Sequence, residues 1–342
     1  MRAAVYYSNK DIRIEERPKP KIGPEELLVR VEACGICGSD VMEWYRIDRV
    51  PLVLGHEISG IIEEAGGGIK EYKKGDRIAC AHHVPCGNCH YCLSGHDSVC
   101  DTLRKTNVDP GGFAEYIRLP EINVKKGVFP LPDNVAFEEA TFIEPVACVL
   151  RGQRLAEGVK GKSVLVLGSG IAGLLHIHLA RIHGASLVVA TDINQYRINA
   201  AKKFGAHAAF NAREYSPEFL RELNQGRLTD LVIVTSAAEQ AIKQALESVE
   251  RGGTILFFAP TDKNKKIPLI FNNLFWKQEI TLTSSYAASP QEYQQALDLI
   301  ASNKLNISEM ITHKFALKNI TKGFQLVAEA KDSIKVIIEP QK

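Results

Sequence analysis

The sequence predicts an α/β protein with two parts, a mainly β-strand part and a doubly wound parallel sheet. Its length of 342 residues is the first observation, because so long a chain suggests about two domains of roughly 150 residues each. The second is a series of short strand-like segments over about the first 140 residues, separated by glycine and proline. The third is a change near Pro132, after which strands alternate with helix-length segments.

The composition is that of an ordinary globular protein, with 45% hydrophobic and 24% charged residues and a formal net charge of +2. This small charge gives no electrostatic footprint for nucleic acid or an anionic membrane, and we expect neither as a partner. The segment Met1–Tyr7 lacks the apolar core of a signal peptide, and no run of 18 apolar residues occurs. Eight cysteines in such a chain favour metal ligation or free thiols over disulfides, so we expect a cytoplasmic protein.

The predicted strands of the first part alternate apolar and polar residues or contain β-branched runs. They include Met1–Tyr7, Glu26–Val31 and Gly60–Glu64. The predicted strands of the second part are apolar runs separated by helical segments. They are Ser163–Gly168, Leu187–Asp192, Leu231–Val234, Thr254–Phe258 and Ile280–Thr283. Beyond Tyr286 we expect a helix over Pro290–Ser302 and a final strand over Ile334–Ile338.

A dinucleotide-binding motif begins at the end of the first of these apolar strands. Gly168-Ser169-Gly170-Ile171-Ala172-Gly173 fits the pattern G-x-G-x-x-G, and a predicted helix over Leu174–Gly184 follows it. The first glycine permits a tight turn, the second lets the backbone approach a pyrophosphate, and the third allows close packing of helix on strand. The free N–H groups at the helix N-terminus then face the phosphates. A glycine-rich helix start without a ligand is the alternative, which the flanking strand and helix disfavour.

Asp192 ends the next predicted strand, 19 residues after Gly173. A carboxylate there accepts hydrogen bonds from the adenosine ribose and repels a 2′-phosphate, which favours NAD over NADP. Arg197 lies five residues further on, where it either balances a phosphate or flanks the adenine. NADP therefore stays open as the less favoured coenzyme.

Four of the cysteines lie close together in the sequence. Cys86, Cys89, Cys92 and Cys100 have the spacing C-x2-C-x2-C-x7-C. Four thiolates can close a tetrahedral zinc with no open position, which makes such a site structural. Buried free thiols do not fit the polar flanks, and an iron–sulfur run expects its fourth cysteine after three residues and before a proline. We therefore predict a structural zinc.

The other four cysteines differ in their surroundings. Cys80, at a strand end, and Cys148, among apolar residues, are expected to be inert core thiols. Cys34 and Cys37 have the spacing of a redox pair, but the strand-rich surroundings lack the βαβ context of a thioredoxin-like dithiol. A catalytic zinc needs three protein ligands and an open position. Cys37, His56 and a carboxylate are suited to supply those ligands.

Taken in order, these motifs resemble one family. Cys37-Gly38-Ser39-Asp40 is followed by Gly55-His56-Glu57, the four-cysteine lobe, Glu144-Pro145 and the glycine motif with its aspartate. The sequence resembles the zinc-dependent medium-chain dehydrogenase/reductase family, particularly its sorbitol (polyol) and threonine dehydrogenase branch, over essentially the whole chain. The resemblance implies a GroES-like catalytic domain over residues 1–145 with a structural-zinc lobe at 84–101, a Rossmann NAD-binding domain over 146–286, and a C-terminal segment, 287–342, that returns to the catalytic domain. It also implies a homodimer or homotetramer.

The resemblance further implies which residues hold the catalytic zinc. Cys37 and His56 correspond to ligands of the family. Glu57 is implied to ligate directly or through water, and Glu144 to approach the metal when Glu57 leaves, so the third ligand stays open. Ser39 is placed to pass on the proton of the substrate alcohol.

Other positions correspond to groups that orient a ligand or contact coenzyme. Asp40 is implied to orient His56. The coenzyme-contacting positions are Ala172 of the glycine motif and, beyond that motif, Asp192, Arg197, Phe258 and Tyr286. Tyr286 also falls at a substrate-contacting position.

The reaction implied is the NAD-linked oxidation of a secondary alcohol, with a polyol or vicinal diol as the first candidate substrate. Zinc lowers the pKa of the hydroxyl, and a hydride passes to the nicotinamide. Met42-Glu43 replaces the His-Tyr pair common in polyol dehydrogenases, Ser285 replaces their arginine, and Ser39 stands where the threonine branch usually has threonine. Threonine and simple alcohols therefore stay open as substrates. A zinc-free reductase of the superfamily and a non-catalytic binding protein are further alternatives, which the intact candidate ligands disfavour.

Overall fold

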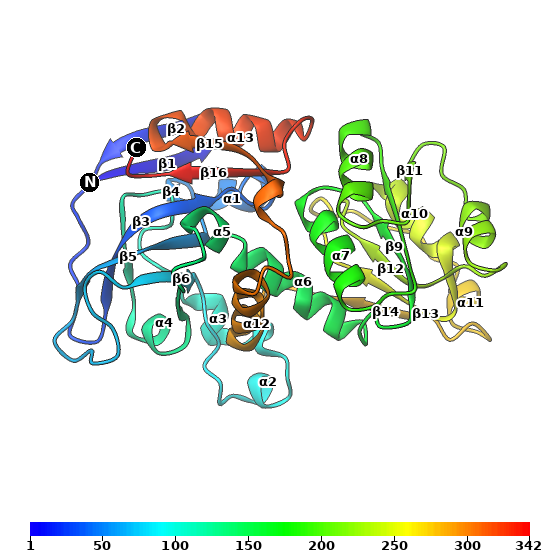
Figure 1. Cartoon of the computed structure of the whole chain (residues 1–342), viewed down its shortest axis with the longest axis horizontal. Coiled ribbons are helices and arrows are strands. Elements are labelled where there is room, and N and C mark those ends of the chain that lie inside the picture. The colour runs from blue at the N-terminus through cyan, green and yellow to red at the C-terminus, as the bar shows by residue number, and fades with distance from the viewer. The chain divides into compact units, whose positions relative to one another are not determined.

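The computed structural model describes residues 1–342 and divides them into two compact units (Figure 1). The first unit comprises Met1–Ala147 and Ala287–Lys342, and the second comprises Cys148–Tyr286. The first unit is therefore built from both ends of the chain, and the N and C termini both lie on it. None of the helices combines the length and apolar character that a membrane span requires.

Two β-sheets form the first unit. The larger has seven strands in the order β15-β16-β3-β5-β6-β8, with β7 pairing with β3 beside this path, and the smaller has three in the order β2-β1-β4. The strands are β1 (Arg2–Ser8), β2 (Asp11–Glu16), β3 (Leu27–Gly35), β4 (Leu52–Val53), β5 (Glu57–Ala65), β6 (Arg77–Ala81), β7 (Tyr116–Leu119), β8 (Val128–Pro130), β15 (Ile311–Ala316) and β16 (Lys335–Glu339).

Strand β3 organises the larger sheet, because it pairs antiparallel with β5, β7 and β16. Seven of its nine residues are buried, which is why its sequence is almost continuously apolar. The C-terminal strand β16 lies against the end of β3, with Ile337 opposite Gly35. This pairing brings the last residues of the chain next to the turn that carries Cys37.

The helices of the first unit are mostly short. The chain forms α1 (Glu43–Arg46), α2 (His90–Leu93), α3 (Asp101–Lys105), α4 (Glu121–Lys126), α5 (Phe137–Ala140), α12 (Pro290–Ala301) and α13 (Ile320–Glu329), and α6 (Ile143–Leu155) crosses the unit boundary in the sequence. Helix α12 starts as the sequence predicts, with proline at its first position and a capping box between Ser289 and Glu292 that satisfies free N–H groups at this end.

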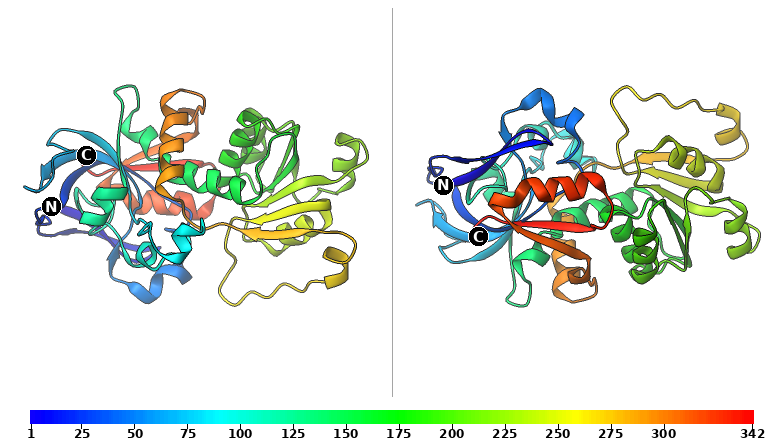
Figure 2. Two further views of the ribbon diagram at one scale, coloured as in Figure 1. Left: turned by 90° about the horizontal axis from the view of Figure 1, so that it is seen from below. Right: turned by 90° about the horizontal axis from the view of Figure 1, so that it is seen from above.

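The second unit is a doubly wound parallel sheet of six strands, in the order β11-β10-β9-β12-β13-β14. Helices lie on both faces of the sheet (Figure 2). The strands are β9 (Ser163–Leu167), β10 (Leu187–Asp192), β11 (Ala208–Asn211), β12 (Thr229–Val234), β13 (Val249–Phe257) and β14 (Thr281–Ser284). The helices are α7 (Ile171–Ile182), α8 (Gln195–Lys203), α9 (Glu218–Leu223), α10 (Glu239–Ser248) and α11 (Phe271–Leu274).

The predicted α/β fold class is confirmed, and the apolar runs of the second part form central strands. All five residues of β9 are buried, since both faces of the sheet are covered. Leu165 and Leu167 pack in one cluster with Ile242 and Ala245 of α10. Strand β11 was not predicted, because Ala-Ala-Phe-Asn is short and lacks the β-branched residues that mark a strand.

Candidate metal centres and coenzyme site

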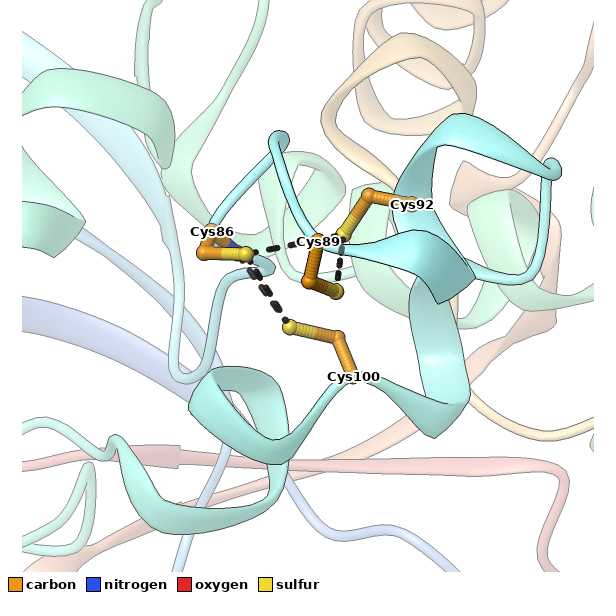
Figure 3. Close-up of side chains that lie close together, drawn as sticks. All are labelled: Cys86, Cys89, Cys92 and Cys100. Atoms are coloured by element: carbon orange, nitrogen blue, oxygen red, sulfur yellow. Dashed lines mark hydrogen bonds between the residues drawn. The ribbon is translucent and has the colours of Figure 1, made fainter.

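The four cysteines of the lobe direct their sulfur atoms toward one point (Figure 3). Cys86 lies in the loop after β6, Cys89 and Cys92 lie at α2, and Cys100 precedes α3. The Sγ–Sγ distances are 3.6 Å for Cys89–Cys92, 3.6 Å for Cys86–Cys100 and 3.9 Å for Cys86–Cys92. A tetrahedral zinc with Zn–S bonds of about 2.3 Å requires sulfur atoms about 3.8 Å apart. The donor set therefore fits a closed zinc site.

Backbone N–H groups support negative charge on these sulfur atoms. The amide of Cys86 donates to Cys100 Sγ over 3.4 Å, and the amide of Gly87 donates to Cys92 Sγ over 3.3 Å. Burial alone would raise the pKa of Cys100, but hydrogen bonds from the amides of Cys86 and Leu103 lower that pKa to about 6. Burial raises the pKa of Cys92 to about 12, so the hydrogen bonds within the chain favour the thiolate, the form that binds metal, at Cys100 but not at Cys92.

A second group of candidate ligands consists of Cys37, His56 and Glu57, whose sulfur, imidazole nitrogen and carboxylate oxygen all lie within 4.8 Å of one another. Cys37 stands in the turn after β3, and His56 and Glu57 stand at the start of β5. They meet because β3 and β5 pair with Gly35 opposite Glu57. Glu144 is buried near the start of α6 and lies outside this group. Three donors of S, N and O type match a catalytic zinc site, which keeps a position for water or substrate.

Asp40 holds both Cys37 and His56 in place. Its Oδ2 accepts a hydrogen bond of 3.0 Å from the amide of Cys37, and its Oδ1 lies 3.3 Å from His56 Nδ1. Although burial raises the pKa of Asp40, His56 and Arg46 together bring that pKa below its usual value. Although burial lowers the pKa of His56, Asp40 and Cys37 raise it well above its usual value. The contact through Nδ1 leaves Nε2 of His56 for a metal, as is common for histidine ligands.

Arg46 contacts the same turn and was not predicted as a site residue. It donates from Nη2 to Ser39 Oγ over 3.2 Å and from Nε to the carbonyl of Ser39 over 3.1 Å, and Nη2 lies 3.7 Å from Asp40 Oδ1. Because a guanidinium only donates hydrogen bonds, the Ser39 oxygen is the acceptor in this pair. The proton of the Ser39 hydroxyl therefore points to another acceptor. Sequence spacing gave no sign of this contact, since Arg46 stands in the short helix α1.

Lys335 was also not predicted, although it forms a buried ion pair with Glu57. Both side chains are buried, with relative exposures of 0% and 1%. The ammonium lies 3.5 Å from the carbonyl oxygen of Ile36 and 5.7 Å from the ring centre of Phe142. Gly35 leaves room for the pair, because a Cβ atom there would lie 2.7 Å from Lys335 Cε. Glu57 thus faces both the candidate metal position and a buried lysine.

The remaining thiols of the first unit lie apart from the metal groups. Cys34 and Cys80 are buried and belong to the hydrophobic core. Burial raises the pKa of Cys80 to about 12 and that of Cys34 well above its usual value, so both stay protonated. The two cysteines of the Cys34-x-x-Cys37 pair therefore have different environments.

In the second unit, the glycine motif forms a tight turn between β9 and α7. Gly168 has φ +99°, a conformation that favours glycine, and a Cβ atom on Gly173 would clash with the carbonyl oxygen of Gly168. A Cβ atom on Gly170 would meet nothing nearer than Arg197 Nη1 at 3.7 Å, so the backbone at Gly170 is open to a ligand. Helix α7 begins at Ile171, followed by Ala172, with its N–H groups at this turn. The turn has the form needed to hold a pyrophosphate.

Asp192 ends β10 beside this turn, where its Oδ2 accepts from the amide of Ser169 over 2.8 Å and its Oδ1 from the amide of Asn194 over 2.9 Å. An ionised carboxylate has further lone pairs, which remain available to ribose hydroxyls. Phe258 and Tyr286 follow β13 and β14, so they stand at the same carboxyl edge of the parallel sheet as Gly168 and Asp192. Ligands of open parallel sheets bind at this edge.

Comparison with known proteins assigns both parts of the chain. Residues 23–133 match the family model described as alcohol dehydrogenase GroES-like domain, and residues 172–302 match the model described as zinc-binding dehydrogenase. The chain is 29% identical to the sorbitol dehydrogenase of Bacillus subtilis, covering 100% of the chain and 98% of that protein. It is 32% identical to the probable D-xylulose reductase A of Aspergillus clavatus, covering 96% and 93%. It is 30% identical to the galactitol 1-phosphate 5-dehydrogenase of Escherichia coli K12, covering 99% and 100%.

Solved structures show the same fold over almost the whole chain. A zinc-binding dehydrogenase from Sinorhizobium meliloti 1021, bound to NADP, has a TM-score of 0.86 at 28% identity, covering 99% of each chain. An alcohol dehydrogenase from Escherichia coli CFT073, complexed with NADH, has a TM-score of 0.88 at 25% identity, also covering 99% of each chain. Similar structures thus hold either coenzyme.

Proposed function

Because the chain belongs to the zinc-binding dehydrogenase family with an alcohol dehydrogenase GroES-like domain, we propose that it catalyses the reversible NAD-linked oxidation of a secondary hydroxyl of a polyol or vicinal diol. The observation that carries this proposal is the group of Cys37, His56 and Glu57, with its three donors within 4.8 Å. The choice of a polyol is supported by the three relatives, whose names each refer to a polyol or a ketose.

We propose that Cys37, His56 and Glu57 hold the catalytic zinc, and that Cys86, Cys89, Cys92 and Cys100 hold a structural zinc. Four sulfur donors leave no position for substrate, whereas three mixed donors leave one. Glu57 is favoured over Glu144 as the third ligand, because only Glu57 belongs to the donor group.

When bound, zinc supplies Lewis-acid activation that lowers the pKa of a substrate hydroxyl, and NAD supplies the hydride acceptor. The residues of the chain position these groups and move the proton. Asp40 keeps the His56 ring turned toward the metal through the 3.3 Å contact. Ser39 receives the substrate proton while Arg46 holds its oxygen through the 3.2 Å hydrogen bond. A guanidinium does not deprotonate in proteins, so the proton leaves Ser39 by another route than Arg46.

We propose NAD as the coenzyme, with NADP less favoured. Asp192 is placed to accept from the ribose, and its negative charge opposes a 2′-phosphate. Gly168, Gly170 and Gly173 present the pyrophosphate turn, together with the α7 N–H groups of Ile171 and Ala172. Arg197 lies beside Gly170, where it is placed to contact a phosphate. Phe258 and Tyr286 are proposed to line the nicotinamide end.

We further propose a homodimer or homotetramer joined through the sheet of the second unit. Strand β14 is the last strand of this sheet, so its outer edge carries open backbone groups. The segment before it exposes large apolar side chains, among them Ile270 at 71%, Phe271 at 69% and Trp276 at 64%. A cytoplasmic location is proposed because the eight cysteines form no disulfide and five of them are proposed zinc ligands.

The test is a substrate panel assayed on zinc-loaded protein with NAD and with NADP. The panel comprises sorbitol, xylitol, galactitol, galactitol 1-phosphate, 2,3-butanediol, threonine and 2-butanol, with NADH formation as the readout. We expect two zinc equivalents per chain, turnover of at least one polyol, and loss of turnover in Cys37→Ala. Preference for threonine would change the substrate class, and full turnover by Cys37→Ala would refute the zinc assignment.

A further inference from the structure

A third imidazole, that of His82, lies beside the candidate catalytic zinc site. His82 directly follows β6, and β5 and β6 pair antiparallel with Glu57 opposite Ala81. One residue further along this register, position 56 faces position 82, so the two side chains emerge on the same face of the sheet. The ring centres of His56 and His82 are 5.0 Å apart. A side chain at position 82 is therefore a direct neighbour of a zinc ligand.

The backbone of His82 is firmly held. Its carbonyl oxygen accepts a hydrogen bond of 3.0 Å from the amide of Val108 and one of 3.1 Å from Asn123 Nδ2. The His83 ring lies against the His82 ring, with a centre distance of 3.8 Å and an angle of 31° between the ring planes. The direction of the His82 side chain is thus fixed by groups on both sides, as a specific contact with a ligand requires.

His82 is not itself a metal ligand, because the donor group of Cys37, His56 and Glu57 does not include it. Its Nδ1 atom is buried and has no hydrogen-bond partner in the chain. An imidazole has two ring nitrogens for hydrogen bonding, and the chain leaves one of them, Nδ1, without a partner.

We propose that His82 is a substrate-binding residue that hydrogen-bonds a second hydroxyl of the substrate, next to the hydroxyl that is oxidised. This inference rests on the proposed function and names the group that distinguishes a diol from a simple alcohol. A diol that offers its second hydroxyl to the imidazole satisfies the ring, whereas a mono-alcohol leaves it unpaired. Because a site built to hydrogen-bond a hydroxyl strongly disfavours an analogue that lacks it, the His82 ring would select for a diol over a mono-alcohol.

The test compares 2,3-butanediol, or the best polyol of the panel, with 2-butanol in the wild type, His82→Phe and His82→Gln. Phenylalanine keeps a ring of similar shape but cannot hydrogen-bond, and glutamine keeps a donor and an acceptor. One hydrogen bond of 1–3 kcal/mol corresponds to roughly 5- to 150-fold. We expect the ratio of kcat/KM for diol over mono-alcohol to fall by about 10- to 100-fold in His82→Phe, mainly through KM, and to recover in large part in His82→Gln.

A readout apart from turnover is the affinity of the diol for zinc-loaded enzyme without coenzyme, measured by calorimetry, which should weaken in His82→Phe by a similar factor. Zinc content and the thermal midpoint are measured on the same preparations. An equal loss for diol and mono-alcohol would show a structural role and overturn the inference. If the wild type oxidises no alcohol, the proposed function fails. If the wild type prefers diols and His82→Phe keeps that preference, only the role of His82 fails.

Discussion

The ion pair between Lys335 and Glu57 offers the sharpest test of the site, through the substitution Lys335→Met. Methionine keeps the length of the lysine side chain but removes the charge, so Glu57 is left as a buried carboxylate without its partner. The pair joins β16 to β5, strands far apart in the sequence, and neither side chain reaches solvent. Water therefore cannot replace the missing ammonium.

Removing one partner of a buried ion pair costs about 3–5 kcal/mol. For domains of about 150–250 residues, each kcal/mol lowers the midpoint of thermal unfolding by roughly 2–4 °C. The metal-free Lys335→Met variant should therefore unfold roughly 6–20 °C below the wild type. In the metal-free protein the double variant Glu57→Leu/Lys335→Met should recover most of this loss, because well-packed hydrophobic side chains of similar volume often replace a buried pair at little cost.

The control is Lys314→Met. Lys314 lies in β15, the strand next to β16, and its ammonium pairs with Glu138. Lys314 is 48% exposed, so this change should cost no more than about 1 kcal/mol. Urea unfolding is followed by the fluorescence of Trp44, which lies in the first unit, in proteins that also carry Trp276→Phe so that the tryptophan of the second unit does not contribute, and it gives the free energy for each variant. If metal-free Lys335→Met loses no more stability than Lys314→Met, the buried pair is refuted.

The same experiment with zinc decides between the two candidate ligands. If Glu57 binds the zinc, the metal gives it a new partner in Lys335→Met, and the loss of stability becomes smaller than in the metal-free protein. If Glu144 takes the third position, Glu57 stays unpaired, and the loss is the same with and without zinc.

Three further predictions concern other parts of the chain. Cys89→Ser should reduce the zinc content from two equivalents per chain to one and lower the midpoint of thermal unfolding, while activity at low temperature is kept. Loss of activity in a protein of unchanged stability would contradict a structural site. Asp192→Ala should lower the preference of kcat/KM for NAD over NADP by about 10-fold or more, since it removes a ribose acceptor and a repelling charge, and an unchanged ratio would count against the NAD assignment. Burial lowers the pKa of His176 to about 3. Between pH 6.5 and 3 the unfolded chain therefore binds a proton at this residue that the folded chain does not. As the pH is lowered from 7 to 5, the free energy of unfolding should decrease by about 2 kcal/mol. Urea unfolding at pH 7 and pH 5 should show this loss reduced in His176→Leu, and an equal loss in both proteins would refute it.

The sequence was sufficient to predict the fold class, because strands buried on both faces are recognisable as apolar runs. The glycine motif could also be identified from the sequence, because each glycine is needed for the local geometry of the turn, such as the positive φ of Gly168. Candidate ligands were also proposed from motifs, because Cys37 shortly follows one strand, β3, and His56 immediately precedes another, β5.

Lys335, Arg46 and His82 could not be predicted in this way. Lys335 meets Glu57 only because β16 pairs with β3, a register set by packing across almost the whole chain. His82 meets His56 through the β5–β6 register, which the sequence alone does not specify to the residue. Arg46 belongs to none of the sequence motifs, and only the fold turns it toward Ser39. Contacts of this kind depend on strand pairing, so spacing motifs do not contain them.

The unpredicted cations explain how two buried carboxylates can stand beside a thiolate. Lys335 neutralises Glu57, and Arg46, at 3.7 Å, offsets Asp40. If zinc is held by Cys37, Glu57 and a neutral His56, the Cys37 thiolate would be the one uncompensated anion of the group, and the divalent ion would leave one net positive charge. Loss of the proton from a substrate hydroxyl would then bring this charge to zero, so the buried cations would favour the deprotonation that oxidation requires. Replacing Lys335 should therefore slow alcohol oxidation by the zinc-loaded protein as well as reduce stability.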